Sequence, residues 1–156
     1  MLRGVFSHIP TFAIIVLVAC SAPQQKLPSV PAGESYRSFT EDGAWCWFSD
    51  PRAIHYVGEE DKTYSGWVDS LGNIVVGSYD HKNGSIQTYV LHPRFEQDDH
   101  DNPSFLMDSD GKLMVFYTKH ATGNSPIFLA RASEPESISD WQPLQTLRLN
   151  DTSAYA

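Results

Sequence analysis

Positive charge is scarce in this sequence. Its 156 residues include 11 Lys and Arg against 19 Asp and Glu, which gives a formal net charge of −8 at pH 7. A nucleic-acid partner requires a basic face, because binding to phosphates depends on Lys and Arg. The composition therefore argues against a nucleic-acid partner.

Long hydrophobic runs are also missing. The apolar run Phe12–Ala19 is far shorter than the roughly 20 residues that span a bilayer. It follows Arg3 and leads into Leu17-Val18-Ala19-Cys20, which resembles the lipobox of bacterial lipoproteins. We therefore interpret residues 1–19 as a lipoprotein signal peptide and Cys20 as the residue that receives the lipid. A plain secretory signal is the alternative.

The segment after the signal contains prolines and few apolar residues. Residues 20–36 include Pro28 and Pro31, and we interpret them as the lipidated cysteine followed by a tether. The predicted location is exported and membrane-anchored, in a bacterial outer membrane or at the cell surface. Cleavage before Cys20 removes Arg3 and no acid, so the mature chain carries 10 Lys and Arg against 19 acids, a formal charge of −9.

Cysteine is rare, with two in the whole chain. Once Cys20 carries a lipid, Cys46 has no cysteine left to pair with, and no intrachain disulfide is expected. A buried and unreactive thiol is the expected state of Cys46.

A convincing amphipathic helix of ordinary length is absent. Short runs rich in β-formers instead alternate with Gly, Asn and Asp turns, which is typical of an all-β fold. The chain also repeats itself: Asp69-Ser70-Leu71-Gly72 recurs 39 residues later as Asp108-Ser109-Asp110-Gly111. The same shift places His81 on His120 and the run Thr88–Leu91 on Ile127–Ala130.

Each copy of the repeat indicates a hairpin followed by a third strand. The segment Ser139–Leu147 supplies a candidate fourth strand for the second copy. Four antiparallel strands in every ~40 residues are typical of a β-propeller blade, and a sandwich is the alternative fold. Residues 37–156 would then make about three blades of an incomplete ring, because propellers close with roughly four to eight blades. We predict the N-terminal part of a truncated propeller.

Two histidines are spaced equally about the second turn. His100 lies ten residues before Asp110, and His120 lies ten residues after it. If Ser104–Met107 pairs with Met114–Tyr117, both histidines reach the same end of the hairpin. The arrangement predicts a functional pair, although a structural role for either histidine alone remains the simpler interpretation.

The surroundings of His100 are acidic. The run Asp98-Asp99-His100-Asp101-Asn102-Pro103 contains three carboxylates, an imidazole and an amide. Such a cluster has oxygens that suit Ca²⁺, although it lacks the spacing of an EF-hand loop. A zinc site made by His100, His120 and a third ligand is a second alternative, and a solvated acidic loop is a third. The aromatic residues Trp45, Trp47 and Trp67 are expected in the core rather than on a sugar-binding surface.

Four segments of the chain resemble the BNR-4 repeat family, which includes ulvan lyases with a seven-bladed propeller. The segments are Gly43–Ala53 (GAWCWFSDPRA), Tyr79–His81 (YDH), Asp98–Pro103 (DDHDNP) and Phe116–His120 (FYTKH). The resemblance covers about Gly43 to Ala132. It implies a polysaccharide lyase that cleaves an ulvan-like, uronate-containing acidic polysaccharide by β-elimination, with a membrane link through the lipid anchor.

The resemblance also implies site residues. His100 and His120 match two catalytic histidines of the lyases in motif and spacing; His100 is the expected acid or base, and His120 the expected binder of the acid sugar. Asn102, Lys119 and His81 lie in the matched motifs and are predicted to bind substrate. The catalytic tyrosine and the carboxylate-binding arginine of the family have no match in this sequence, so the chain alone is expected to be inactive.

Two other functions are alternatives. A non-catalytic, glycan-binding propeller lipoprotein would use the same fold with Trp and Tyr platforms. A sialidase-like hydrolase would need an arginine cluster and a Tyr/Glu nucleophile pair, neither of which is evident in the sequence.

Overall fold

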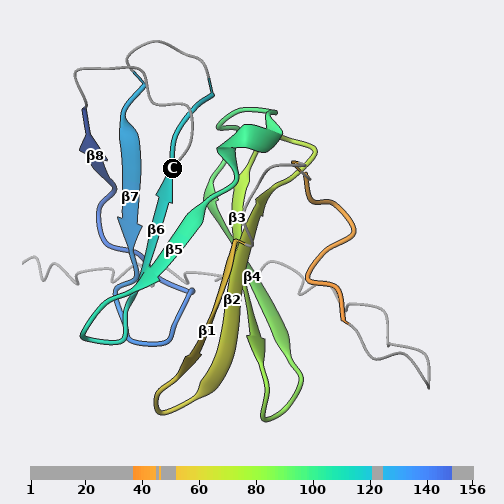
Figure 1. Ribbon diagram of the computed structural model, residues 1–156, viewed down its shortest axis with the longest axis vertical. Coiled ribbons are helices and arrows are strands. Elements are labelled where there is room, and N and C mark those ends of the chain that lie inside the picture. Colours follow the sequence, from red (N-terminus) through yellow and green to blue (C-terminus); the bar gives the residue numbers. More distant parts are fainter. Residues whose placement is uncertain (1–36, 45, 47–51, 121–124, 149–156) are drawn as a thin grey trace, which may run out of the picture.

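The computed structural model describes residues 37–44, 46, 52–120 and 125–148. These residues form eight β-strands and one short 3-10 turn, arranged as two four-stranded antiparallel sheets (Figure 1). The prediction of an all-β fold built from four-stranded antiparallel units is confirmed. The predicted signal peptide, the lipidation site Cys20 and the tether lie outside the described residues, as do Trp45 and Trp47. In the part of the chain that is described, no helix has the length and apolarity to cross a membrane.

The first sheet follows chain order from β1 to β4. It contains β1 (Ala53–Val57), β2 (Asp61–Val68), β3 (Ile74–Asp80) and β4 (Ile86–His92). The turn between β2 and β3 is built by Asp69, whose Oδ1 accepts hydrogen bonds from the backbone N–H groups of Leu71 and Asn73. Gly72 has φ of 73°, a conformation that favours glycine.

The second sheet has the same order. It contains β5 (Ser104–Met107), β6 (Leu113–Tyr117), β7 (Ile127–Arg131) and β8 (Gln145–Leu147), and the 3-10 turn η1 (Asp99–Asp101) precedes β5. Ser104 pairs with Phe116 and Met107 with Leu113, so the predicted hairpin about Asp108–Gly111 is confirmed. The predicted fourth strand is confirmed in β8, which pairs with β7.

The sequence repeat and the sheet repeat differ. The repeated turn joins the second and third strands of the first sheet, but the first and second strands of the second sheet. β1 begins at Ala53 and β5 at Ser104, 51 residues later, rather than 39. The first sheet gains β1 before the repeat, whereas the second gains β8 after it. The described residues therefore form two four-stranded sheets, where a period of ~40 residues predicts about three.

One hydrophobic core contains side chains from both sheets. Its most deeply buried members, each at most 1% exposed, are Tyr64, Val68, Ile74, Val76, Leu113, Val115, Tyr117, Ala130 and Ala132. Alternate residues of β2 and β6 contribute to it, as expected for strands with one face inward. Trp67 is 7% exposed, which confirms its predicted place in the interior, and Cys46 is buried as expected.

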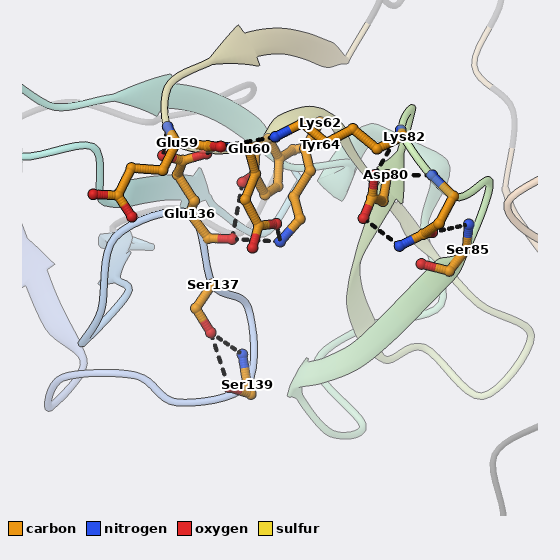
Figure 2. A network of polar contacts seen from close by, with 11 residues as sticks. Glu59, Glu60, Lys62, Tyr64, Asp80, Lys82, Ser85, Glu136, Ser137 and Ser139 are labelled. Carbon is orange, nitrogen blue, oxygen red and sulfur yellow. Dashed lines mark hydrogen bonds and ion pairs between the residues drawn. The ribbon is translucent and has the colours of Figure 1, made fainter.

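Glu136 joins the two sheets at one end (Figure 2). Its Oε1 and Oε2 accept hydrogen bonds from the backbone N–H groups of Glu59 (2.7 Å) and Glu60 (2.8 Å), in the turn between β1 and β2. Its carbonyl oxygen accepts from Lys62 Nζ and from the hydroxyl of Tyr64, each at 3.0 Å. A residue from the connection between β7 and β8 thus holds the first hairpin of the other sheet.

Candidate functional site

His100 and His120 lie against each other at the end of the second sheet where η1 is located. His100 belongs to η1 and His120 follows β6, and the pairing of β5 with β6 carries the two residues to the same end. Their rings are stacked, with centroids 3.8 Å apart and an interplanar angle of 12°. The predicted convergence of the two histidines is therefore confirmed, while their chemical roles stay a prediction.

Asp98 links the two imidazoles. His100 Nδ1 lies 2.7 Å from Asp98 Oδ1, and His120 Nδ1 lies 3.2 Å from Asp98 Oδ2. An ionised carboxylate can only accept hydrogen bonds, so both Nδ1 atoms act as donors. In a neutral imidazole this leaves Nε2 as the acceptor, which is the atom able to take a proton from a substrate. One side chain thereby sets the tautomer of both rings.

The charge on Asp98 is stabilised locally. Partial burial opposes this charge, but hydrogen bonds from the backbone N–H of His100 and from both imidazoles lower the pKa of Asp98 overall. The backbone bond is 2.9 Å long and also caps η1. His100 Nδ1 additionally lies 3.1 Å from Asp99 Oδ1. The site is thus a pair of imidazoles held in place by negatively charged carboxylates.

A second carboxyl group supports the backbone of His120. Asp101 is 1% exposed, and its Oδ1 accepts a 2.8 Å hydrogen bond from the N–H of His120. Asp101 Oδ2 and Glu96 Oε2 are buried and find no donor among the described residues. Burial, followed by the neighbouring Glu96 carboxyl, raises the pKa of Asp101 to about 7. Protonation of Asp101 removes a buried charge from beside the Glu96 carboxyl group.

The three predicted substrate-binding residues occupy different places. Asn102 is 6% exposed, and its amide bonds to the protein backbone: Oδ1 accepts from Val68 N (2.9 Å), and Nδ2 donates to Ala44 O (3.4 Å). Lys119 precedes His120, and its ammonium lies over the ring of Phe95, 5.3 Å from the centroid. His81 lies at the turn after β3, away from the histidine pair, beside His55 and Asp61.

A shallow hollow adjoins the histidine pair. It has a volume of about 280 Å³, and Asp98 and Asp99 contribute to its wall. The other lining residues come from the segment before β1, the end of β2 with its turn, and the loop before η1: Asp42, Gly43, Ala44, Val68, Asp69, Ser70 and Gln97. The end of β2 and three neighbouring segments of the chain therefore build this region.

The donor atoms around His100 are also compatible with a transition metal. One ligand atom each from Asp98, His100 and His120 lie within 4.8 Å of one another, and the same holds for Cys46, Asp99 and His100. Imidazole with thiolate or carboxylate suits zinc better than calcium, which takes six to eight oxygens. The residues thus fit a zinc ion better than a calcium ion, and metal binding itself stays a prediction.

Sequence reasoning identified the acidic run but not the separate tasks of its members. The link through Asp98 depends on the approach of His120, which is 22 residues away along the chain. The partner of Asp101 is Glu96, which lies outside the motif. The equal spacing about the Asp108–Gly111 turn, which predicted that the histidines meet, could also have placed Asp98 beside both. Asp98 lies only two residues before His100.

The chain was compared with curated proteins and with solved structures. No curated protein matches the chain. Among solved structures, the chain is similar to an ulvan lyase of polysaccharide lyase family PL25, described as bound to -[GlcA(1-4)Rha3S]-. The TM-score is 0.52 at 20% sequence identity, and the similar region covers 75% of this chain and 30% of the lyase chain. At this identity the similarity shows the fold alone, and this chain spans less than a third of the lyase.

The fold similarity and the sheet topology agree, and the two sheets are blades of a β-propeller. Residues 62–155 match the model of the BNR_4 family, described as a BNR repeat-containing family. This match begins in β2 and extends past β8. Because it covers more than half of the sequence, the chain belongs to the BNR repeat-containing family.

Proposed function

We propose that this chain is the N-terminal part of a cell-surface polysaccharide lyase that cleaves a uronate-containing, ulvan-like glycan. The observation that carries the proposal is the stacked pair His100 and His120, held through Nδ1 by the single carboxylate of Asp98. Support comes from the fold, which is similar to that of a lyase described with a bound uronate-containing oligosaccharide.

The reaction is a β-elimination. A base removes the proton on C5 of the uronate, the electron pair of that C–H bond forms the C4–C5 double bond, and the C4–O bond breaks. The departing oxygen takes up a proton, so atoms and charge balance. The step requires a general base, a general acid and a group that stabilises the charge developing on the carboxylate.

The site residues divide these tasks in the proposal. His100, through Nε2, exchanges the proton, and His120 binds the acid sugar with its own Nε2 side. Asp98 is a positioning residue, because it holds both rings in the Nδ1–H tautomer and stabilises the imidazolium that forms. Lys119 provides a cation one residue from His120 and lowers the cost of an anionic substrate beside Asp98 and Asp99.

The proposal also includes a lipid anchor and catalytic groups from further blades. Lipidation at Cys20 would hold the propeller at the membrane surface, where a large external polysaccharide is accessible. Because the chain spans 30% of the similar lyase, the remaining catalytic groups would come from further blades of a longer product. The glycan site would then be completed around the propeller axis.

The test measures formation of the unsaturated uronate by its ultraviolet absorbance, with the complete gene product and ulvan as first substrate. His100→Ala and His120→Ala should abolish the signal. Asp98→Asn should lower kcat/KM by about 100-fold and change its pH profile, because an amide can donate to Nδ1 and reverse the tautomer. The matched control is Glu134→Gln, an exposed acid outside the site, which should leave activity unchanged.

Two outcomes would contradict the proposal. Full activity in a folded His100→Ala variant would remove the pair from the chemistry. Retention of the glycan on the folded wild-type protein, without unsaturated product from any uronan, would favour the non-catalytic glycan-binding lipoprotein.

A further inference from the structure

We propose that His55, Asp61 and His81 form a binding site for a divalent transition-metal ion of the zinc class, separate from the His100–His120 pair. We name these three residues the blade-end cluster. β2 begins at Asp61 and ends at Val68, whose N–H bonds to Asn102 next to η1. The blade-end cluster therefore lies toward the opposite end of the first sheet, the end that carries the β1–β2 and β3–β4 turns (Figure 1).

Strand register places the three side chains on one face of the first sheet. His55 pairs with Thr63, and Thr63 pairs with Tyr79, so these three neighbours face the same way. Asp61 precedes Thr63 by two residues and His81 follows Tyr79 by two, which keeps both on that face as the chain continues. Tyr64 points to the opposite face and enters the core, so the blade-end cluster faces away from the core.

The donor atoms are already close together. His55 Nε2 lies 2.7 Å from Asp61 Oδ1, and the rings of His55 and His81 meet edge to face with centroids 5.0 Å apart. One ligand atom from each of His55, Asp61 and His81 falls within 4.8 Å of the other two. Tetrahedral zinc, with ligands at about 2.0–2.2 Å, places ligand atoms roughly 3.4 Å apart. Small rotations of these partly or fully exposed side chains achieve that spacing.

The backbone and two neighbouring side chains fix the cluster. The N–H of His81 donates to the carbonyl oxygen of Asp61 at 2.9 Å, which ties the turn after β3 to the start of β2. The ring of Tyr79 lies edge-on to His81, with centroids 4.7 Å apart. Thr63 Oγ1 lies 2.9 Å from His81 Nε2 and occupies the atom that a metal would take. A metal ion therefore has to displace this hydrogen bond and the one between His55 Nε2 and Asp61 Oδ1, but it does not have to bring the three residues together.

The ligand chemistry selects the ion. Two imidazoles and one carboxylate are a zinc ligand set that leaves a fourth position for water. Calcium and magnesium are disfavoured, because they prefer oxygen ligands. Asp61 supplies the carboxylate oxygen, which lies against the imidazole of His55. The nearby cation Lys82 is directed to the carbonyl oxygen of Glu59, at 2.8 Å.

The consequence of binding is mechanical. The three ligands come from β1, from β2 and from the turn after β3, so one ion would fasten three neighbouring segments at a sheet end. Binding to the folded state alone raises stability with metal concentration. Metal binding at the blade-end cluster does not depend on lyase activity.

The experiment is zinc titration calorimetry, together with the visible absorption of cobalt, on the chain carrying His100→Ala and His120→Ala. This background removes the other histidine pair, so that binding reports on the blade-end cluster. We expect one ion per chain with the absorption of four-coordinate cobalt, and a thermal transition that rises with added zinc. His55→Ala, His81→Ala and Asp61→Asn each remove one proposed ligand and should each weaken zinc binding by about 100-fold.

Thr63→Val is the matched control. It removes the hydrogen bond to His81 but no ligand, so binding should stay within about tenfold of the parent or become tighter. Zinc affinity that is unchanged in His55→Ala and His81→Ala, or no binding by the folded parent, would overturn the proposal. Imidazole NMR signals of His55 and His81 that shift with zinc while that of His92 does not would support it independently of any variant.

Discussion

Glu136 and Asp101 are both buried acids that hold backbone from a distant part of the chain, and they lie at opposite ends of the two blades. Glu136 is 9% exposed and Asp101 is 1% exposed. Each oxygen of Glu136 accepts from a backbone N–H, those of Glu59 and Glu60. Asp101 has one such donor, His120 N, and its other oxygen faces a second carboxyl group, that of Glu96.

The difference shows that burial alone does not determine the cost of a carboxyl group. A buried charge is tolerated when hydrogen bonds replace water on both oxygens. When one oxygen of a buried carboxyl group has no hydrogen-bond donor and another acid lies nearby, the protonated form of that group costs less free energy than the ionised form. Glu136 therefore acts as a structural clasp, whereas Asp101 couples the backbone beside the histidine pair to pH.

The largest expected effect tests the clasp. Glu136→Gln leaves one acceptor for two N–H donors and places an amide NH₂ against the other, so we expect a loss of about 3 kcal/mol in the free energy of unfolding. Urea denaturation followed by tryptophan fluorescence measures it. Gly58→Ala should act in the same direction, because a Cβ there collides with the carboxylate of Glu136.

Glu134→Gln is the control for the clasp, since Glu134 is exposed and two residues away. Its unfolding free energy should change by less than about 0.5 kcal/mol. Equal stability of the Glu136→Gln and Glu134→Gln variants would contradict the stabilising role assigned to Glu136.

The second prediction concerns the pH dependence that Asp101 creates. Its folded pKa of about 7 lies above the ordinary 3.8, so between these values the folded state holds more protons than the unfolded state. The unfolding free energy contributed by this group is therefore fully present below about pH 4 and falls as pH rises to about 7. Asp101→Asn should match the wild type at pH 4 and exceed it by on the order of 2 kcal/mol at pH 8.

Unfolding curves of both proteins at several pH values measure this difference. The asparagine retains an acceptor for His120 N and offers a donor to Glu96, so it imitates the protonated acid. A variant that is less stable than the wild type at pH 8 would show that Asp101 stabilises the fold as an ionised group.

The smallest expected loss of stability is at an exposed acid, Asp110, in contrast to the buried acids Glu136 and Asp101. Asp110 is 66% exposed at its side chain and lies 3.0 Å from Arg131 Nη2. Arg131 also bonds to Asp108 through Nε at 2.7 Å, so Asp110→Asn leaves the cation paired. We expect a loss of no more than about 0.5 kcal/mol, which disappears at high salt, in thermal unfolding at two ionic strengths.

Much of the fold could be predicted from local signals. The turns at Asp69 and Asp108 and the alternation in the strands indicate antiparallel hairpins, because both depend on neighbours in sequence. The blade boundary could not be obtained in this way. The self-similar segment runs from β2 to β4 and from β5 to β7, and only sheet pairing shows that β1 belongs to the first blade and β8 to the second.

The candidate site was predictable to the same extent. One turn sufficed to bring His100 and His120 together, since a hairpin relates residues at equal distances from its centre. His81 was grouped with them by motif, but the structure places it at the other end of the first blade with His55 and Asp61. Motif membership carries no information about which end of a strand a residue occupies.

The sequence by itself determined the all-β class, the antiparallel hairpins and the meeting of the two histidines, because turn chemistry and alternation act over a few residues. Only the tertiary structure decided the state of the buried acids. Asp101 Oδ2 and Glu96 Oε2 have no donor among the described residues, while Glu136 accepts from two backbone donors more than seventy residues away. Whether a buried carboxyl group keeps its proton depends on the donors that folding brings to it, and these come from segments remote along the chain.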